Sequence, residues 1–130
     1  MKLNEASPDN RLNATLAALA DPTRRAIVER LRRGEARVTE LAEPFEMSLN
    51  AVSKHIRVLE QARLVRRRRV WREHWVAFDP LPLIEAAAWM DRQRAFWTER
   101  LDALERILKA EDAAKADTNK SKQKKPRNKR

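Results

Sequence analysis

The amino-acid sequence predicts a mainly α-helical fold with one small β-hairpin. Apolar residues recur at the three- and four-residue spacing of helices over most of the chain. Capping residues or prolines precede several of these runs, as they do where helices begin. The alternating pattern of strands occurs only between residues 64 and 78. A chain of 130 residues with this pattern is expected to form five helices and a hairpin around one core.

The first two predicted helices begin with the same device. Ser7-Pro8 and Asp21-Pro22 each join a side chain that can accept hydrogen bonds from free backbone N–H groups to a proline at the first helical position. The second helix is expected to end at Gly34, the only glycine of the chain. Glycine is favoured there because it adopts positive φ without a steric penalty.

Two further helices with a very short connection follow. Thr39–Phe45 is predicted as a short helical segment, and Ser48–Leu59 as a capped helix with Val52, Ile56 and Leu59 on one apolar stripe. Two helices with so tight a junction form a helix-turn-helix, whose second helix can enter the major groove of DNA. The candidate DNA-contacting residues of this helix are Ser48, Leu49, Asn50, Ser53, Lys54 and Arg57.

These candidates have different expected roles. Asn50 and Ser53 are expected to touch base edges, and Lys54 and Arg57 are expected to contact phosphates, because long flexible cations fix register poorly. His55 lies on the side of the apolar stripe and is expected to be a packed, hydrogen-bonded residue at the edge of the core.

The hairpin is predicted to carry four consecutive arginines, Arg66, Arg67, Arg68 and Arg69. Successive side chains on a strand point to opposite faces, so at most two of the four can face DNA while the others pair with acids or stay solvated. The turn contains neither glycine nor asparagine, and a loop of several residues near Trp71–Glu73 is therefore expected.

The last helix, predicted from about Leu83 to about Ala110, is more apolar than one packing partner requires. We expect its surplus to pair with a second copy of the chain. The candidate dimer residues of this helix are Trp89, Met90, Phe96, Trp97, Leu101, Leu104 and Leu108.

The basic charge is concentrated at the C-terminus. The net charge is +10, and residues 115–130 hold eight Lys or Arg against one Asp. We expect residues 1–110 to form the DNA-binding and dimerisation domain and residues 111–130 to form a disordered basic tail that tethers the protein to DNA of any sequence.

Several classes of function are disfavoured. The chain has no cysteine, which removes disulfides and thiolate chemistry. It has no apolar run long enough to span a bilayer, so we expect a cytoplasmic protein with no membrane partner, associated with the nucleoid when bound to DNA. Two isolated histidines and no glycine-rich phosphate loop argue against an enzyme, and no cofactor or metal is expected.

Residues 19–27, 40–48 and 51–59 together resemble the ArsR/SmtB family of bacterial winged helix-turn-helix regulators. The resemblance covers about residues 10–108 and implies a homodimeric repressor whose fourth helix reads the major groove and whose hairpin is the wing. It also implies that the first and last helices pair across the two-fold axis, which adds Leu12 and Leu16 of the first helix to the candidate dimer residues. Family members that sense metal carry cysteine pairs or histidine ligands that this chain lacks. Arg63 replaces the glycine that commonly ends the recognition helix, and Asn50 stands where close relatives often have proline.

The sequence therefore predicts a sequence-specific transcriptional regulator, a repressor that binds double-stranded DNA at an inverted repeat as a homodimer. Its inducer, where one acts, would be a small molecule or a protein. Two alternatives are an architectural protein of the nucleoid that binds DNA without sequence preference and a protein-interaction module. The short polar face of the fourth helix argues against both alternatives.

Overall fold

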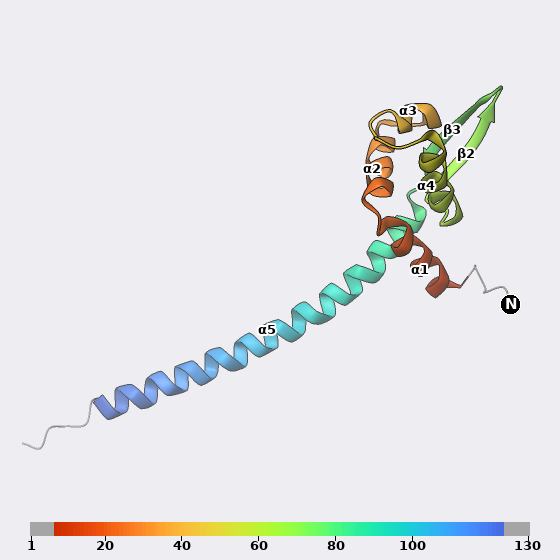
Figure 1. Ribbon diagram of the computed structural model, residues 1–130. Helices are drawn as coiled ribbons and strands as arrows, with labels where there is room; N and C mark the ends of the chain where they lie inside the picture. The colour runs from red at the N-terminus through yellow and green to blue at the C-terminus, as the bar shows by residue number, and fades with distance from the viewer. Residues whose placement is uncertain (1–6, 124–130) are drawn as a thin grey trace, which may run out of the picture. The chain divides into compact units, whose positions relative to one another are not determined.

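A computed structural model describes residues 7–123 of the chain. Within α5 the chain divides into two units, Met1–Trp89 and Met90–Arg130. In chain order the elements are α1 (Pro8–Leu19), α2 (Pro22–Arg30), the 3-10 helix η1 (Leu31–Arg33), β1 (Ala36–Arg37), α3 (Val38–Ala42), α4 (Leu49–Gln61), β2 (Val65–Val70), β3 (Glu73–Phe78) and α5 (Leu81–Gln123) (Figure 1). The predicted class, mainly helical with a small hairpin, is confirmed.

The predicted helix starts are also confirmed. Ser7 accepts a hydrogen bond from the backbone N–H of Asn10, and Asp21 accepts one from that of Arg24. Ser48 likewise caps α4 by accepting from the backbone N–H of Ala51 at 3.1 Å. The predicted third helix is shorter than expected, because α3 covers only Val38–Ala42.

Two helices end at residues with positive φ. Gly34 closes the 3-10 turn after α2 at φ 114°, as its position in the sequence predicted. Arg63 follows α4 at φ 62°. The N–H of Arg63 donates to the carbonyl of Glu60 and that of Leu64 donates to the carbonyl of Leu59, both at 2.9 Å, which is the Schellman pattern. Arginine thus takes the left-handed conformation that glycine usually supplies.

The sheet has three antiparallel strands in the order β1-β3-β2. Strand β1 was not predicted, because two residues are too few to show an alternating pattern. The expected loop of several residues is wrong. Val70 pairs with Glu73, which leaves a turn of two residues, Trp71 and Arg72, and Trp71 itself adopts φ 60°.

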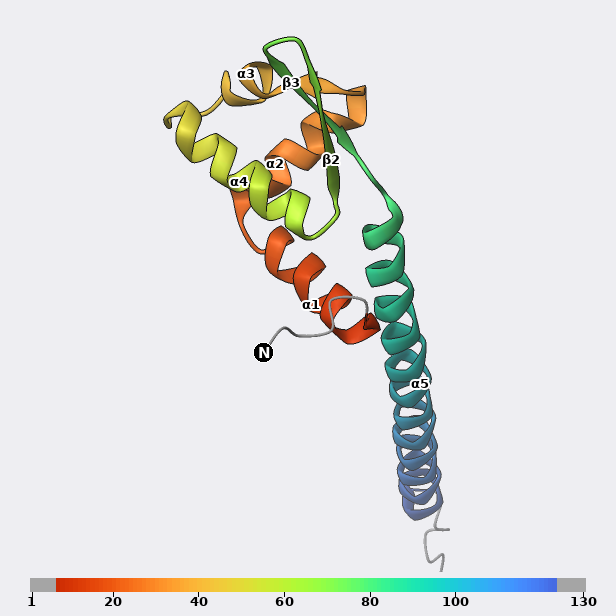
Figure 2. The ribbon, with the colours of Figure 1, turned by 90° about the vertical axis from the view of Figure 1, so that its right-hand side faces the viewer.

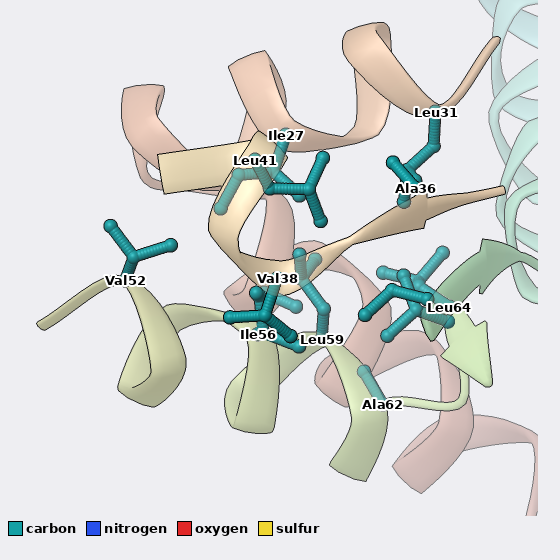
Figure 3. Close-up of a cluster of buried hydrophobic side chains, with 13 residues drawn as sticks. Ile27, Leu31, Ala36, Val38, Leu41, Val52, Ile56, Leu59, Ala62 and Leu64 are labelled. Carbon is teal, nitrogen blue, oxygen red and sulfur yellow. The ribbon is translucent and has the colours of Figure 1, made fainter. Parts of the chain in front are cut away.

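The core of the first unit lies between α2, α3, α4 and the sheet. Val52, Ile56 and Leu59 of α4 are fully buried and point toward Ile27 of α2 and Leu41 of α3 (Figure 3). Burying a side chain of this size stabilises the fold by roughly 1.5–3 kcal/mol. This stripe fixes which face of α4 is left at the surface.

Helix α5 is longer than the sequence predicted. The expected end near Ala110 is wrong, and so is the disorder expected from residue 111 as far as Gln123, because the helix continues to that residue. Residues 111–123 include several Ala and Lys and contain no glycine or proline, so no helix-breaking residue stops the helix there. The rest of the predicted tail, residues 124–130, lies outside the described residues.

Candidate nucleic-acid interface

Helix α4 presents a polar face opposite its buried stripe. Asn50, Lys54 and Arg57 are exposed, Leu49 is 50% exposed, and Ser53 is half-buried. The alternation follows from helical spacing, since residues three and four apart share a face. Five of the six candidates are thus brought together on α4, with α3 lying at its N-terminal end (Figure 2).

Ser48 precedes this face as the cap of α4. Its Oγ accepts the N–H of Ala51, which holds the serine at the exposed helix start. A hydroxyl that accepts one hydrogen bond can still donate another. The first turn of α4 therefore offers free backbone N–H groups and short polar side chains at the same place, an arrangement that suits contact with a polyanion.

The two cations of α4 are available for an outside partner. Within residues 7–120, neither Lys54 nor Arg57 forms an ion pair with a carboxylate. Most other arginines of the first unit are engaged by acids or backbone carbonyls. The free cations of α4 therefore mark its polar face as the surface best suited to phosphate.

The four arginines of β2 divide into three with acidic partners and one without. Arg66 Nη2 lies 2.9 Å from Oδ2 of Asp79, and Arg67 Nε lies 3.7 Å from Oε2 of Glu60. Arg68 Nε donates to Oε2 of Glu35 at 2.8 Å. The expectation that some of the four pair with acids is confirmed.

Arg69 has a different partner. Its Nε donates to the backbone carbonyl of Trp71 at 2.9 Å, and within the described part of the chain it meets no carboxylate. No carboxylate among the described residues therefore offsets the charge of this guanidinium beside the hairpin turn. Arg72, the second residue of the turn, is also exposed and forms no ion pair there.

These ion pairs hold the carboxylates ionised. The guanidinium of Arg68 lowers the pKa of Glu35, and the pKa of Arg68 is raised by the same contact. The backbone N–H of Leu81, followed by the side chain of Arg66, lowers the pKa of Asp79. Near neutral pH both acids are charged, so Arg66 and Arg68 are neutralised locally.

The middle of the hairpin is held in place around one aromatic ring. Trp75 of β3 lies between the guanidinium of Arg37, 5.8 Å from the ring centroid, and that of Arg68 at 6.0 Å. Arg37 also bonds Glu40 and Glu73, and the backbone N–H and guanidinium of Arg37 lower the pKa of Glu40. The contacts fix the hairpin to α3 and to the segment before β1.

A second cluster ties α4 to the turn between α1 and α2. Arg24 donates to the carbonyl of Ala18 at 2.6 Å and approaches Nδ1 of His55 at 3.2 Å. Asp21 lies 3.8 Å from the same ring nitrogen, and the backbone N–H of Arg24 lowers the pKa of Asp21. His55 is half-buried, so the prediction of a hydrogen-bonded residue at the core edge is confirmed.

The candidate dimer residues remain largely uncovered within the single chain. Leu12 is half-buried and Leu16 is 37% exposed on α1, whereas Trp97 and Leu101 of α5 are 58% and 63% exposed. Phe96 and Trp97 meet edge to face with centroids 5.2 Å apart. The other exposed members of the set are Trp89, Met90, Phe96, Leu104 and Leu108.

Sequence reasoning did not single out the tryptophan of the hairpin turn. Trp71 is 89% exposed at the hairpin turn. The one sequence signal at this turn is that it contains neither glycine nor asparagine. Taken alone, that signal favours a longer loop and does not point to an exposed tryptophan. Within residues 7–123 no helix is long and apolar enough to cross a membrane, and no group of three metal-ligating side chains comes together.

Comparison with known proteins matches this architecture. A family model described as a helix-turn-helix domain matches residues 19–68. The HTH-type transcriptional regulator Rv2034 of Mycobacterium tuberculosis is 43% identical over 94 residues, which cover 72% of this chain and 85% of that protein. The transcriptional repressor SdpR of Bacillus subtilis is 29% identical over 79 residues, which cover 61% of this chain and 88% of that protein.

Solved structures of regulators match a larger share of the chain than the family model does. A crystal structure of an ArsR family transcriptional regulator is 41% identical, with a TM-score of 0.67, and the match covers 69% of this chain and 93% of that one. An ArsR-like regulator from Rhodococcus sp. RHA1 is 32% identical, with a TM-score of 0.64 and coverage of 75% and 92%. The chain therefore belongs to the ArsR family of winged helix-turn-helix regulators and is a DNA-binding transcriptional regulator.

Proposed function

We propose that this regulator represses transcription as a homodimer bound to an inverted-repeat operator. The observation that carries the proposal is the two-sided character of α4, with Val52 and Ile56 fully buried and Asn50 and Lys54 exposed. A rigid underside fixes the helix, and the polar face can be inserted into a major groove.

The residues of this face contact two different parts of the DNA. Asn50 and Ser53 contact base edges, because short polar side chains in the first turns of a recognition helix reach the groove floor. Ser48 and Leu49 lie at the helix start beside them. Lys54 and Arg57 contact phosphates and set the position of the helix on the duplex.

The hairpin adds phosphate contacts as the wing. Arg69 is the best-placed arginine of the four, since Arg66, Arg67 and Arg68 lie against Asp79, Glu60 and Glu35. DNA contact by the other three requires exchange of a carboxylate for a phosphate. The exposed Arg66 is the second candidate, because four-fifths of its side chain is open to solvent.

The dimer forms through α1 and α5. Large apolar side chains such as Trp97 and Leu101 are exposed over several turns of α5, and exposed apolar patches of this kind mark association surfaces. A two-fold dimer would place two copies of α4 about 34 Å apart in successive major grooves. Repression is supported by SdpR, which is named a transcriptional repressor. A dimer bound at an operator would repress by blocking the promoter.

Replacement of the base-contacting pair tests this proposal. A variant with Asn50→Ala and Ser53→Ala should lose roughly 1–3 kcal/mol of discrimination for each good base contact while keeping its affinity for unrelated DNA. Gln61→Ala, at the far end of α4, is the matched control and should bind like wild type. An equal loss of affinity for operator and unrelated duplexes would contradict base readout. A wild-type protein with no preference for the operator would instead indicate an architectural protein.

A further inference from the structure

The turn of the β2–β3 hairpin combines two features that do not help the fold. Trp71 is 89% exposed, the largest value among the exposed large apolar side chains of the described residues. Trp75, in contrast, is half-buried between two guanidinium groups. An exposed indole gains nothing from the hydrophobic effect, so packing within the chain does not account for Trp71.

The backbone of Trp71 is unfavourable as well. It is the first of two turn residues and adopts φ 60°, a region that side chains with a Cβ occupy at a cost. Glycine is the usual residue at positive φ in two-residue hairpin turns. Backbone strain of this kind is found where function requires the particular side chain.

Charge at the turn identifies the partner. Arg69 bonds the carbonyl of Trp71, Arg72 follows it, and neither guanidinium meets a carboxylate within the described residues. Val70, next to the tryptophan, is 38% exposed. An aromatic ring flanked by two cations that no carboxylate pairs fits DNA, where phosphates line a groove and an apolar side chain can wedge between stacked base faces.

We propose that Trp71 enters the minor groove of bound DNA and packs its indole against a base step there. The inference rests on the DNA-binding function and deepens it. Figure 1 shows the hairpin extending beyond the helices of the first unit, so its tip is free to reach a groove other than the one that α4 occupies. Apolar wedges in the minor groove unstack base steps and bend the duplex, while Arg69 and Arg72 neutralise the phosphates on either side.

Two substitutions of the full chain test the proposal against a purely structural role. Trp71→Gly relieves the positive φ and should raise the melting temperature, yet it should weaken binding about fivefold or more, because it removes the stacking of an aromatic ring on a base. Trp71→Phe keeps a smaller ring and should lie between glycine and wild type. The probe is a duplex selected by the wild-type protein from a random-sequence library.

The salt dependence separates the ring from the cations. Trp71→Gly should leave the slope of log affinity against log salt unchanged, whereas the control Arg72→Ala should lower it by about 0.9 for each phosphate that Arg72 neutralises. With 2-aminopurine placed beside the recognised half-site, wild type should raise its fluorescence by unstacking it, and Trp71→Gly should not.

The inference would be overturned if Trp71→Gly bound with wild-type affinity and raised the 2-aminopurine emission as wild type does, and also if its effect were confined to the salt slope. A wild-type chain that enriches no sequence from the library would instead contradict sequence-specific binding itself. Failure of the inference therefore shows in the Trp71→Gly variant, and failure of the proposed function shows in the wild-type protein.

Discussion

Arg68 and Glu35 are bound to each other, with Nε of the arginine donating to Oε2 of the glutamate at 2.8 Å. The contact joins the middle of β2 to the residue after Gly34, and it lowers the pKa of the carboxylate. Because Glu35 engages the guanidinium, Arg68 is not available to a phosphate, although it lies in the middle of the predicted basic wing.

Release of this arginine should change how the protein binds DNA. Glu35→Gln frees Arg68 to reach a phosphate, so the salt slope of binding should increase by about 0.9 per protomer. Glu29→Gln removes the same charge from α2, where Glu29 pairs with Arg32 of the neighbouring 3-10 helix, and serves as the control. Titrations at several salt concentrations measure both slopes, and equal increases would contradict a specific role for the Arg68 contact.

Acid should destabilise the fold in a defined range. The pKa values of Asp21, Glu35, Glu40 and Asp79 are all lowered in the folded chain. A carboxylate whose folded pKa is lowered stabilises the fold above its ordinary value, and that contribution is lost as pH falls through the folded pKa. Melting temperatures should therefore stay level from neutral pH to about 5 and fall below about 4.5. A level profile down to pH 3 would contradict this.

The left-handed arginine after α4 should be a site where glycine stabilises the protein. Arg63→Gly removes the steric cost of positive φ and should raise the free energy of unfolding by about 0.5–1 kcal/mol. Arg63→Ala keeps the Cβ and should give no gain. Denaturant unfolding measures both, and a gain in the alanine variant equal to that in the glycine variant would show that φ is not the cause.

The proposed dimer surface can be broken without breaking the fold. Leu101 is 63% exposed in the single chain, so Leu101→Glu should leave unfolding of the first unit nearly unchanged while it dissociates the dimer. Ala95→Glu adds the same charge on the side of α5 away from Leu101 and Leu104 and should remain dimeric. Sedimentation gives the mass of each, and a dimeric Leu101→Glu would place the interface elsewhere.

The basic C-terminal segment should add affinity without specificity. Deletion of residues 115–130 removes eight Lys or Arg and should lower the salt slope by several units, at about 0.9 per phosphate contact. The preference for operator over unrelated DNA should stay the same. A version with these Lys and Arg changed to Gln should behave like the deletion, and an unchanged slope in both would reject the tether.

The extent to which the sequence predicted the structure differs from element to element. Ser7, Asp21 and Ser48 marked helix starts correctly because a cap acts through its own backbone neighbours. Strand β1 was missed because it exists only by pairing with β3. Local rules identify elements that depend on nearby residues, and they fail where a distant segment decides the conformation.

The candidate site was also predicted where nearby residues determine it and missed where distant residues do. The polar face of α4 followed from helical spacing, whereas the pairing of Arg68 with Glu35 joins residues 33 positions apart and left no trace in local patterns. The two-residue turn at Trp71 was missed because its residue type argues against the conformation that it adopts. That conflict between residue and backbone is itself a reason to assign Trp71 a function.

A nuclease footprint on the DNA upstream of the gene for this protein tests the central claim most directly. Two copies of α4 in successive major grooves should protect one inverted repeat, with the centres of its half-sites about 34 Å apart. Asn50→Ala with Ser53→Ala should abolish that protection at concentrations where Gln61→Ala retains it. Diffuse protection that spreads evenly along the DNA, or a single protected half-site, would contradict the account.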